Sequence, residues 1–179
     1  MEIIQWTLPE CEQESGAGYA FNANVRETSP LHTHDFYEIF YVNKGKAIHC
    51  VNGERIVVSS GAFVFIRPWD VHSYDSLNYS EFQMTSIGFT CDEAAEGFRW
   101  SQFPLSMVNV PKLPPHVMLN GAEKRNLRIS LKELRVILVE WNGNGTSILF
   151  SRFLFIYSVT KSDRRKQNSF RLCLHGFLS

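Results

Sequence analysis

The sequence predicts a mainly β protein, a small antiparallel β-barrel followed by a C-terminal α-helical hairpin. Two observations predict the barrel: short strands at even spacing, and strong turn sequences between them. A seam of leucines beyond residue 120 predicts the helices. We expect a barrel with an irregular N-terminal segment at residues 1–115, a helical subdomain at 116–160 and a tail or linker at 161–179.

The first half of the chain alternates between strand-like runs and turns. Residues 1–30 are punctuated by proline and glycine, with one opening strand near residues 18–25. The later strands are expected at 36–42, 46–51, 55–58, 62–66 and 71–74. Asn52-Gly53 lies between two β-branched runs and is typical of a two-residue hairpin turn. This order of short strands favours an antiparallel sandwich or barrel over a βαβ fold.

Helices are expected after the barrel strands. A short helix fits residues 92–100, and Asn120 with Glu123 has the spacing of a capping box that opens a helix at about 122–140. A second helix at about 147–160 is apolar almost all round, which predicts that it is buried. In the first long helix, leucines recur at steps of four and three residues, the spacing with which one helix packs on another. They are Leu127, Leu131, Leu134 and Leu138.

Composition narrows the class of protein. Eighteen basic and eighteen acidic residues give a formal net charge of zero, which argues against nucleic acid as the main partner of these residues. The four cysteines are scattered singly, which is typical of a reducing compartment rather than of a disulfide framework. The most apolar run, 148–159, is too short for a membrane span and contains Arg152. We therefore predict a cytoplasmic protein with no membrane partner.

Three polar residues at the start of the barrel form the candidate site. His32, His34 and Glu38 lie at i, i+2 and i+6, so on a strand their side chains project from one face. We expect His72, which lies beyond the turn at 67–70, to be the fourth partner. Three neutral imidazoles and a carboxylate suit Zn²⁺, Ni²⁺, Fe²⁺ or Mn²⁺. The alternative is a metal-free polar cluster that lines a ligand cavity. We interpret His49, off this pattern, as a strand histidine hydrogen-bonded by its neighbours.

Aromatic and basic residues near the barrel are candidates for ligand binding. Aromatic rings can stack on the apolar face of a sugar ring or on an aromatic effector, although most of them should be core. The candidates are Phe40, Phe63, Phe65, Trp69 and Tyr74. Arg26 and Arg67 lie nearest the expected barrel mouth, where they can hold a carboxylate or sugar hydroxyls, and the alternative for both is a solvated surface position.

These motifs resemble those of a known family. The histidine pair and glutamate of residues 32–38, followed by Gly45, resemble the first cupin motif, and residues 61–72 resemble a shortened second motif. The whole of residues 31–74 is similar to the N-terminal effector-binding domain of AraC-type transcription regulators. Within that family it looks closest to regulators of chitobiose- or cellobiose-type sugar operons. The resemblance implies a cupin, jelly-roll-like barrel that binds a small-molecule effector, a sugar in these regulators.

The resemblance also implies a homodimer. The family places two dimerisation helices after its barrel, which makes the leucine seam a candidate dimer interface, whereas the alternative is that the leucines pack on the barrel or on the second helix. AraC-type regulators continue with a DNA-binding domain of two helix-turn-helix units, and residues 162–179 are too few to form it. We therefore predict no direct DNA binding by these residues.

Two functions remain at this point. The first is a sensing and dimerisation module, which needs a ligand with different affinity for two conformations and no catalytic group. The second is a stand-alone metal-dependent cupin enzyme, such as a dioxygenase, isomerase or lyase. The helical hairpin favours the first function. Because no general base stands out beyond the ligand set, we assign no catalytic residues.

Overall fold

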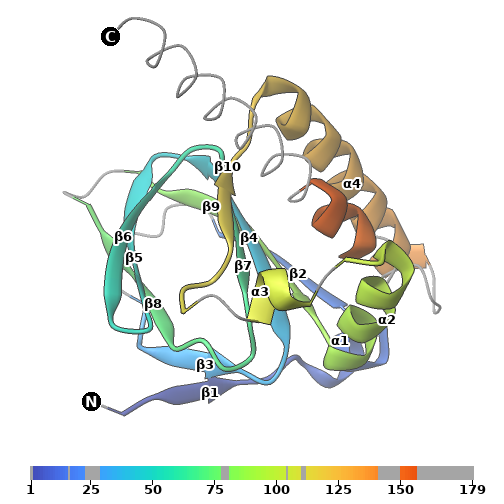
Figure 1. The fold of residues 1–179 in the computed structure, drawn as a ribbon, viewed down its shortest axis with the longest axis horizontal. Coiled ribbons are helices and arrows are strands. Elements are labelled where there is room, and N and C mark those ends of the chain that lie inside the picture. The colour runs from blue at the N-terminus through green and yellow to red at the C-terminus, as the bar shows by residue number, and fades with distance from the viewer. Residues whose placement is uncertain are drawn as a thin grey trace, which may run out of the picture.

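The computed structural model describes residues 2–15, 17–22, 29–77, 81–103, 105–109, 112–140 and 150–156. Two five-stranded sheets face each other, and helices cover the outer face of the second sheet, so the fold has three layers (Figure 1). The mainly β, cupin-like fold class is confirmed. The expected barrel consists of two separate sheets rather than one continuously closed ladder.

The first sheet contains most of the candidate site. Its order is β1 (Ile4–Trp6), β3 (His32–His34), β8 (His72–Ser76), β5 (Lys46–Val51) and β6 (Glu54–Ser59). Neighbouring strands are antiparallel except β1 and β3, which are parallel with Ile4 opposite His32. The turn between β5 and β6 has positive φ at Asn52 (49°) and Gly53 (82°), as a two-residue hairpin turn requires. The predicted hairpin is confirmed.

The second sheet is antiparallel throughout. Its order is β10 (His116–Met118), β7 (Ala62–Ile66), β4 (Tyr37–Lys44), β9 (Gln83–Phe89) and β2 (Ala17–Asn22). In the N-terminal segment the expected opening strand is present as β2, and β1 and the helix α1 (Glu10–Ser15) occur where we expected an irregular chain. The sequence did not predict β1, because an edge strand of three residues is too short to show an alternating pattern of apolar and polar residues.

Two hydrophobic clusters lie on opposite faces of the second sheet. Side chains alternate along β4, so Phe40 and Val42 point toward the first sheet whereas Ile39 and Tyr41 point toward the helices. We call the cluster between the sheets the inner core and the cluster under the helices the outer core. A strand that is apolar on both faces is covered on both sides, and β4 meets this condition.

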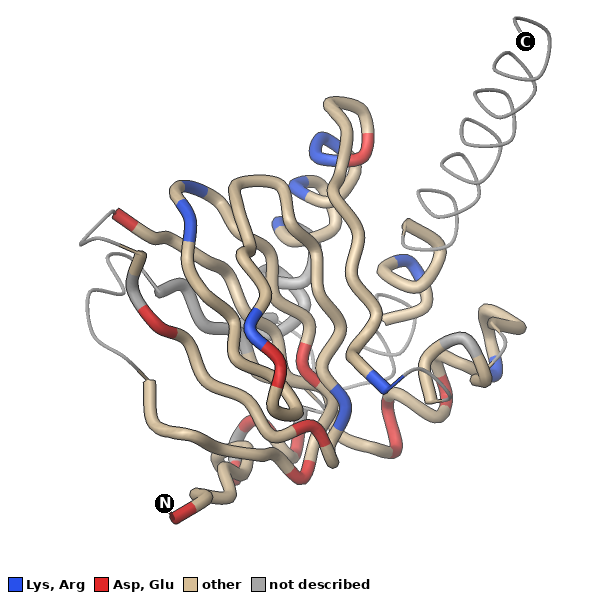
Figure 2. Tube along the Cα trace, turned by 60° about the vertical axis from the view of Figure 1, so that its left-hand side comes forward, with Lys and Arg blue, Asp and Glu red and all other residues tan. Residues whose placement is uncertain are grey.

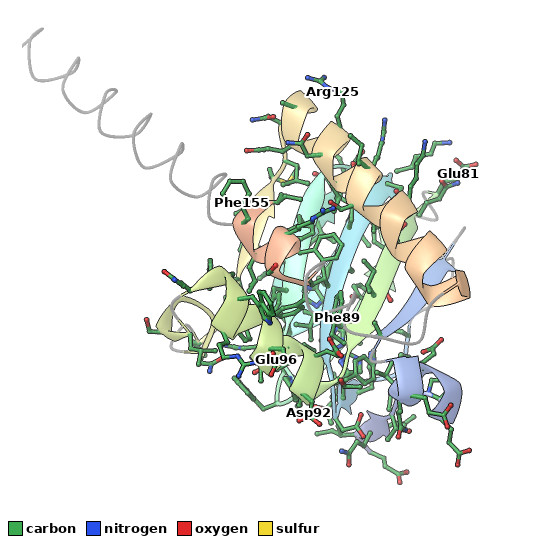
Figure 3. All side chains as sticks on the ribbon, turned by 90° about the vertical axis from the view of Figure 1, so that its right-hand side faces the viewer. Glu81, Phe89, Asp92, Glu96, Arg125 and Phe155 are labelled. Atoms are coloured by element: carbon green, nitrogen blue, oxygen red, sulfur yellow. The ribbon has the colours of Figure 1, made fainter. Side chains whose placement is uncertain are left out.

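The helices pack on the second sheet and share one core with it. They are α2 (Cys91–Ser101), α3 (Ser106–Asn109), α4 (Gly121–Glu140) and the helical residues 150–156. Figure 3 shows them over the sheet, with Phe89 beneath. The strand β10, which the expected boundary between residues 115 and 116 assigns to the helical subdomain, pairs with β7 in the second sheet. The tail at 161–179 lies outside the described residues. In the described part of the chain no helix is both long and apolar enough to cross a bilayer.

The capping box predicted for α4 is present. The Asn120 N–H donates to Glu123 Oε2 at 2.6 Å, and the Glu123 N–H donates to Asn120 Oδ1 at 3.0 Å. Leu127 is fully buried in the outer core and Leu131 packs against that core. The described part of the leucine seam therefore faces its own sheet, which differs from the expected subunit interface. The side chains of Leu134 and Leu138 lie outside the described residues.

A buried ion pair fixes the turn that leads into β8. Arg67 and Asp70 are at most 1% exposed, and the guanidinium donates twice to the carboxylate, at 2.9 Å from Nε and 2.6 Å from Nη2. Arg67 Nη1 also donates to the Val108 carbonyl at 2.9 Å, and Asn52 Nδ2 donates to Asp70 Oδ1 at 2.8 Å. Arg67 thus holds neither a ligand nor a surface position, because its donors are used within the chain. The turn, the β5–β6 hairpin and α3 are held together two residues before His72.

We predict that Arg67→Met lowers the free energy of unfolding by about 3–5 kcal/mol, because it leaves the Asp70 charge buried and uncompensated. The matched control is Arg55→Met, which breaks the exposed Arg55–Asp75 pair (3.2 Å) and should cost less than about 1 kcal/mol. Urea unfolding of both variants measures the difference. Similar losses in the two variants would contradict the structural role given to the buried pair.

Candidate functional site

The structure brings the four predicted site residues together between the two sheets. His32 on β3 is the direct cross-strand partner of His72 on β8, His34 follows on β3, and Glu38 enters from β4 in the other sheet. His34 Nε2 and His72 Nε2 are 3.4 Å apart, and Glu38 Oε2 lies 3.7 Å from each of them. The three histidines offer ligand atoms that all lie within 4.8 Å of one another. All four residues are at most 6% exposed.

Neighbouring groups orient the histidine rings. His32 Nδ1 donates to the Pro30 carbonyl at 2.8 Å, which leaves its Nε2 as a lone pair. His72 Nδ1 lies 3.2 Å from His49 Nε2, and the indole of Trp6 stacks on the His32 ring at 3.7 Å. His49 therefore has the position of a residue that orients a ligand, as the second nitrogen of metal-binding histidines usually requires. His49 lies opposite Tyr74 on β8, and the contact of its ring with His72 was not visible in the motif spacing.

Burial keeps the histidines neutral. It lowers the pKa of His34 and that of His49 to about 4, and it lowers the pKa of His72 well below its usual value. Burial raises the pKa of Glu38 to about 7, and a hydrogen bond from Ser86 acts in the opposite direction. Neutral imidazoles present free lone pairs, so the cluster is chemically prepared to accept a cation.

The spacing of these atoms suits a metal ion. A tetrahedral ion with ligands at about 2.1 Å separates its ligand atoms by about 3.4 Å, close to the distances among His34, His72 and Glu38. Glu38 Oε2 is buried and has no hydrogen-bond partner in the described part of the chain, as a carboxylate awaiting a cation would. His34 differs from most metal-binding histidines, whose second ring nitrogen donates a hydrogen bond. Its Nδ1 is buried and has no hydrogen-bond partner in the described part of the chain. The donor set as a whole fits a divalent transition metal.

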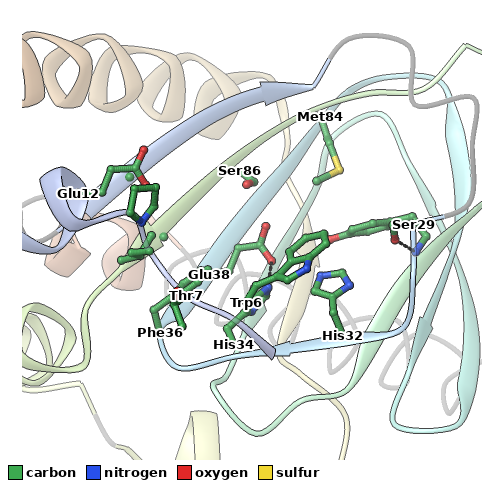
Figure 4. A pocket seen from close by; sticks show the side chains of 15 residues that line it. Trp6, Thr7, Glu12, Ser29, His32, His34, Phe36, Glu38, Met84 and Ser86 are labelled. Carbon is green, nitrogen blue, oxygen red and sulfur yellow. Dashed lines mark hydrogen bonds and ion pairs between the residues drawn. The ribbon is translucent and has the colours of Figure 1, made fainter. Parts of the chain in front are cut away.

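A cavity of about 450 Å³ opens beside the cluster, within the size range of small-molecule sites. Figure 4 shows Trp6, Phe36 and Met84 around it, together with the hydroxyl of Ser86. Among its described lining residues there is no lysine or arginine. The cavity thus has apolar walls and a polar end, which is formed by the histidines and Glu38.

Two glycines set the size of the cavity. Gly18 and Gly88 face each other across β2 and β9, and both line the cavity. A Cβ at Gly18 would lie 1.9 Å from Glu12 Oε2, and a Cβ at Gly88 would lie 2.7 Å from Leu8 Cδ2 and 3.0 Å from the Phe36 ring. Side chains therefore already fill the space that a methyl group would need at either position.

Of the aromatic ligand-binding candidates, only Tyr74 lines this cavity. Phe40 is fully buried in the inner core, whereas Phe63 and Phe65 point to the outer core on the other face of β7. Trp69 is 51% exposed in the turn, with the Arg67 guanidinium 5.4 Å from its ring centroid. Strand alternation explains the two phenylalanines, because odd positions of β7 pair with odd positions of β4.

Other residues are placed differently or lie outside the description. Arg26 is outside the described residues. Trp6, Phe36 and Met84, which sequence reasoning did not select, form the apolar walls instead. Phe36 shares the motif face by simple alternation and could have been found, whereas Trp6 arrives through the pairing of β1 with β3.

A second hollow of about 470 Å³ lies near the start of α2. Acidic positions gather at this end of the molecule, near β1 and α1 in Figure 2. Its acidic lining residues are Glu14, Asp35, Asp92 and Glu93. No histidine is among the described lining residues of this hollow, so it lacks the combination of imidazoles and a carboxylate that the first cavity has.

Known proteins resemble this chain in sequence and in structure. It is 33% identical over 81 residues to the HTH-type transcriptional activator RhaS of Yersinia pestis (strain Pestoides F). The aligned residues make up 45% of this chain and 29% of RhaS. Among solved structures, ToxT from Vibrio cholerae is similar with a TM-score of 0.54 at 14% identity, over 84% of this chain and 56% of ToxT. A cupin protein from Bacteroides fragilis matches with a TM-score of 0.40 at 23% identity, over 42% of this chain and 67% of that protein.

The chain spans less than a third of the RhaS relative, and at 14% identity the likeness to ToxT shows the fold alone. A broader match comes from the sequence profile of a family described as the AraC-like ligand binding domain, which covers residues 16–147. This stretch includes all four residues of the histidine–glutamate cluster. Because the profile covers most of the chain, the chain belongs to the family of AraC-like ligand-binding domains.

Proposed function

We propose that this chain is the sugar-sensing module of an AraC-type transcription regulator, working in the cytoplasm. The observation that carries the proposal is a cavity of about 450 Å³ beside a buried histidine–glutamate cluster, inside a domain of the ligand-binding family. The relative RhaS is named a transcriptional activator, and an effector-sensing module fits that role. Family membership favours binding over the catalysis of a stand-alone cupin enzyme.

The walls of the cavity support a sugar as the effector. Sugar rings have an apolar face of C–H groups and a rim of hydroxyls, so they need flat apolar contacts and hydrogen-bonding groups together. Trp6 and Phe36 supply aromatic surface, and Ser86 and Glu38 supply polar atoms at the same cavity. The resemblance to chitobiose- and cellobiose-type regulators points to β-linked disaccharides as the first compounds to test.

We further propose that His32, His34, His72 and Glu38 hold a divalent transition metal, Zn²⁺, Ni²⁺, Fe²⁺ or Mn²⁺. Three buried imidazoles that converge, the Glu38 carboxyl 3.7 Å from two of them, and the neutral state of the imidazoles support this assignment. Such an ion would supply positive charge beside the cavity, where it would attract the oxygen atoms of a bound molecule. His49 keeps the His72 ring in the orientation that points its Nε2 toward Glu38.

We predict that His34→Ala lowers the affinity for Ni²⁺ and Zn²⁺ by about 100-fold or more, because it removes one of four ligands. His49→Ala should lower it by about 10- to 100-fold, the usual effect of losing an orienting partner. His116→Ala is the control, since His116 is exposed on β10 and should bind as the parent does. Isothermal titration with elemental analysis measures these affinities. Metal content unchanged in His34→Ala would reject the metal site.

We predict that cellobiose or chitobiose raises the melting temperature progressively with its concentration, since a ligand at 100 times its dissociation constant stabilises the folded chain by about 2.7 kcal/mol. Trp6→Ala should lose this stabilisation because it removes a wall of the cavity. The control Trp100→Ala removes a tryptophan that is 65% exposed on α2 and should keep it. Consumption of O₂ or turnover of the sugar would contradict a purely sensing role.

We also propose a homodimer formed through α4. Leu127 and Leu131 pack on their own chain, so the contact has to use the outward face of the helix, where Ile129 is 56% exposed. We predict that Ile129→Glu yields monomers in sedimentation velocity experiments, whereas Val57→Glu, at a 60% exposed position on β6, leaves the dimer intact. A parent chain that sediments as a monomer, or an Ile129→Glu variant that still dimerises, would remove α4 from the interface.

A further inference from the structure

Tyr74 is a buried polar residue in the wall of the cavity whose hydroxyl the fold does not use. The residue is 5% exposed, and its hydroxyl has no hydrogen-bond partner among the described residues. Buried hydroxyls are normally satisfied, because an unmade hydrogen bond inside a protein costs the full desolvation of the group. A phenylalanine would fill the same space without this cost.

The ring of Tyr74 is enclosed by other aromatic rings. It stacks on His49 with a centroid distance of 5.2 Å, and Phe40 and Phe82 lie at 5.3 Å and 6.3 Å. Its backbone is fixed as well, since the Tyr74 N–H donates to Ser29 Oγ at 2.8 Å. The ring is therefore part of the inner core rather than a free stacking surface. Its polar end is what it can offer to the cavity.

The chemical state of the hydroxyl decides what it can bind. A phenol has an ordinary pKa of about 10, so at neutral pH the hydroxyl is protonated and can donate a hydrogen bond. No described residue accepts this proton. An acceptor brought in by a ligand, such as a hydroxyl or carbonyl oxygen, would complete the hydrogen bond.

We propose that Tyr74 is a ligand-recognition residue whose hydroxyl donates a hydrogen bond to an oxygen atom of the molecule bound in the cavity. This inference rests on the proposed sensing function and narrows it, because the ligand must present an oxygen acceptor beside the histidine–glutamate cluster. It also changes the role expected for Tyr74 from stacking on a sugar ring to hydrogen bonding. The hydroxyl lowers the stability of the empty domain and strengthens binding when the cavity is filled.

Tyr74→Phe separates these two effects. In the metal-free and sugar-free chain, removing the unsatisfied hydroxyl should raise the melting temperature by about 2–4 °C. Isothermal titration should show cellobiose or chitobiose binding at least about 10-fold more weakly than in the parent. The affinity for Ni²⁺ should not change, since Tyr74 is not among the four proposed ligands. Tyr41→Phe is the control, because Tyr41 is 4% exposed but lies in the outer core, and it should leave sugar affinity unchanged.

Equal sugar affinity in Tyr74→Phe and the parent would overturn the inference. So would an unchanged or lower melting temperature of the empty Tyr74→Phe variant, because the hydroxyl would then be satisfied within the fold. If neither disaccharide binds the parent, the sugar proposal fails on its own, and the melting temperature of the empty variant still decides the case of Tyr74. A rise would support a hydroxyl kept for another oxygen-bearing ligand.

Discussion

The buried Arg67–Asp70 ion pair is the constraint on which the rest of the site depends. It closes the turn between β7 and β8, and its remaining donors and acceptors reach α3 and the β5–β6 hairpin. Two charges at most 1% exposed are stable only when each is fully paired, so the turn has one geometry. That geometry sets where β8 begins, and His72 is its first residue. The pairing of His72 with His32 then follows.

The cluster beyond this turn is an unusual use of a protein interior. Three imidazoles and a carboxylate occupy space between two sheets that aliphatic side chains would fill more cheaply. The domain tolerates them because the imidazoles are neutral and because two of the rings are held by hydrogen bonds, that of His32 to the Pro30 carbonyl and that of His72 with His49. Groups that are buried, convergent and only partly satisfied by their own chain are typical of a place where something binds.

The sequence predicted the strands β2 and β4 to β8, the Asn52-Gly53 turn, the capping box at Asn120 and the four cluster residues, because each depends on local spacing. It did not predict which face of β7 meets the cavity, since Phe63 and Phe65 are apolar and both faces of that strand are buried. Only the register with β4 decides the matter. Trp6 could not be found either, because its place depends on the parallel pairing of β1 with β3, in which Trp6 lies opposite His34, 28 residues further along the chain.

The facing glycines of β2 and β9 have a consequence for how such a domain can diverge. Where Gly18 and Gly88 leave out their side chains, Glu12, Leu8 and Phe36 take up the room and shape the end of the chamber. A single methyl group at either position would push these neighbours and shrink or reshape the chamber, while the sheet ladder itself stays paired. A glycine-to-alanine change at either position would therefore alter which molecules fit the chamber, without rebuilding the turn or the histidine cluster.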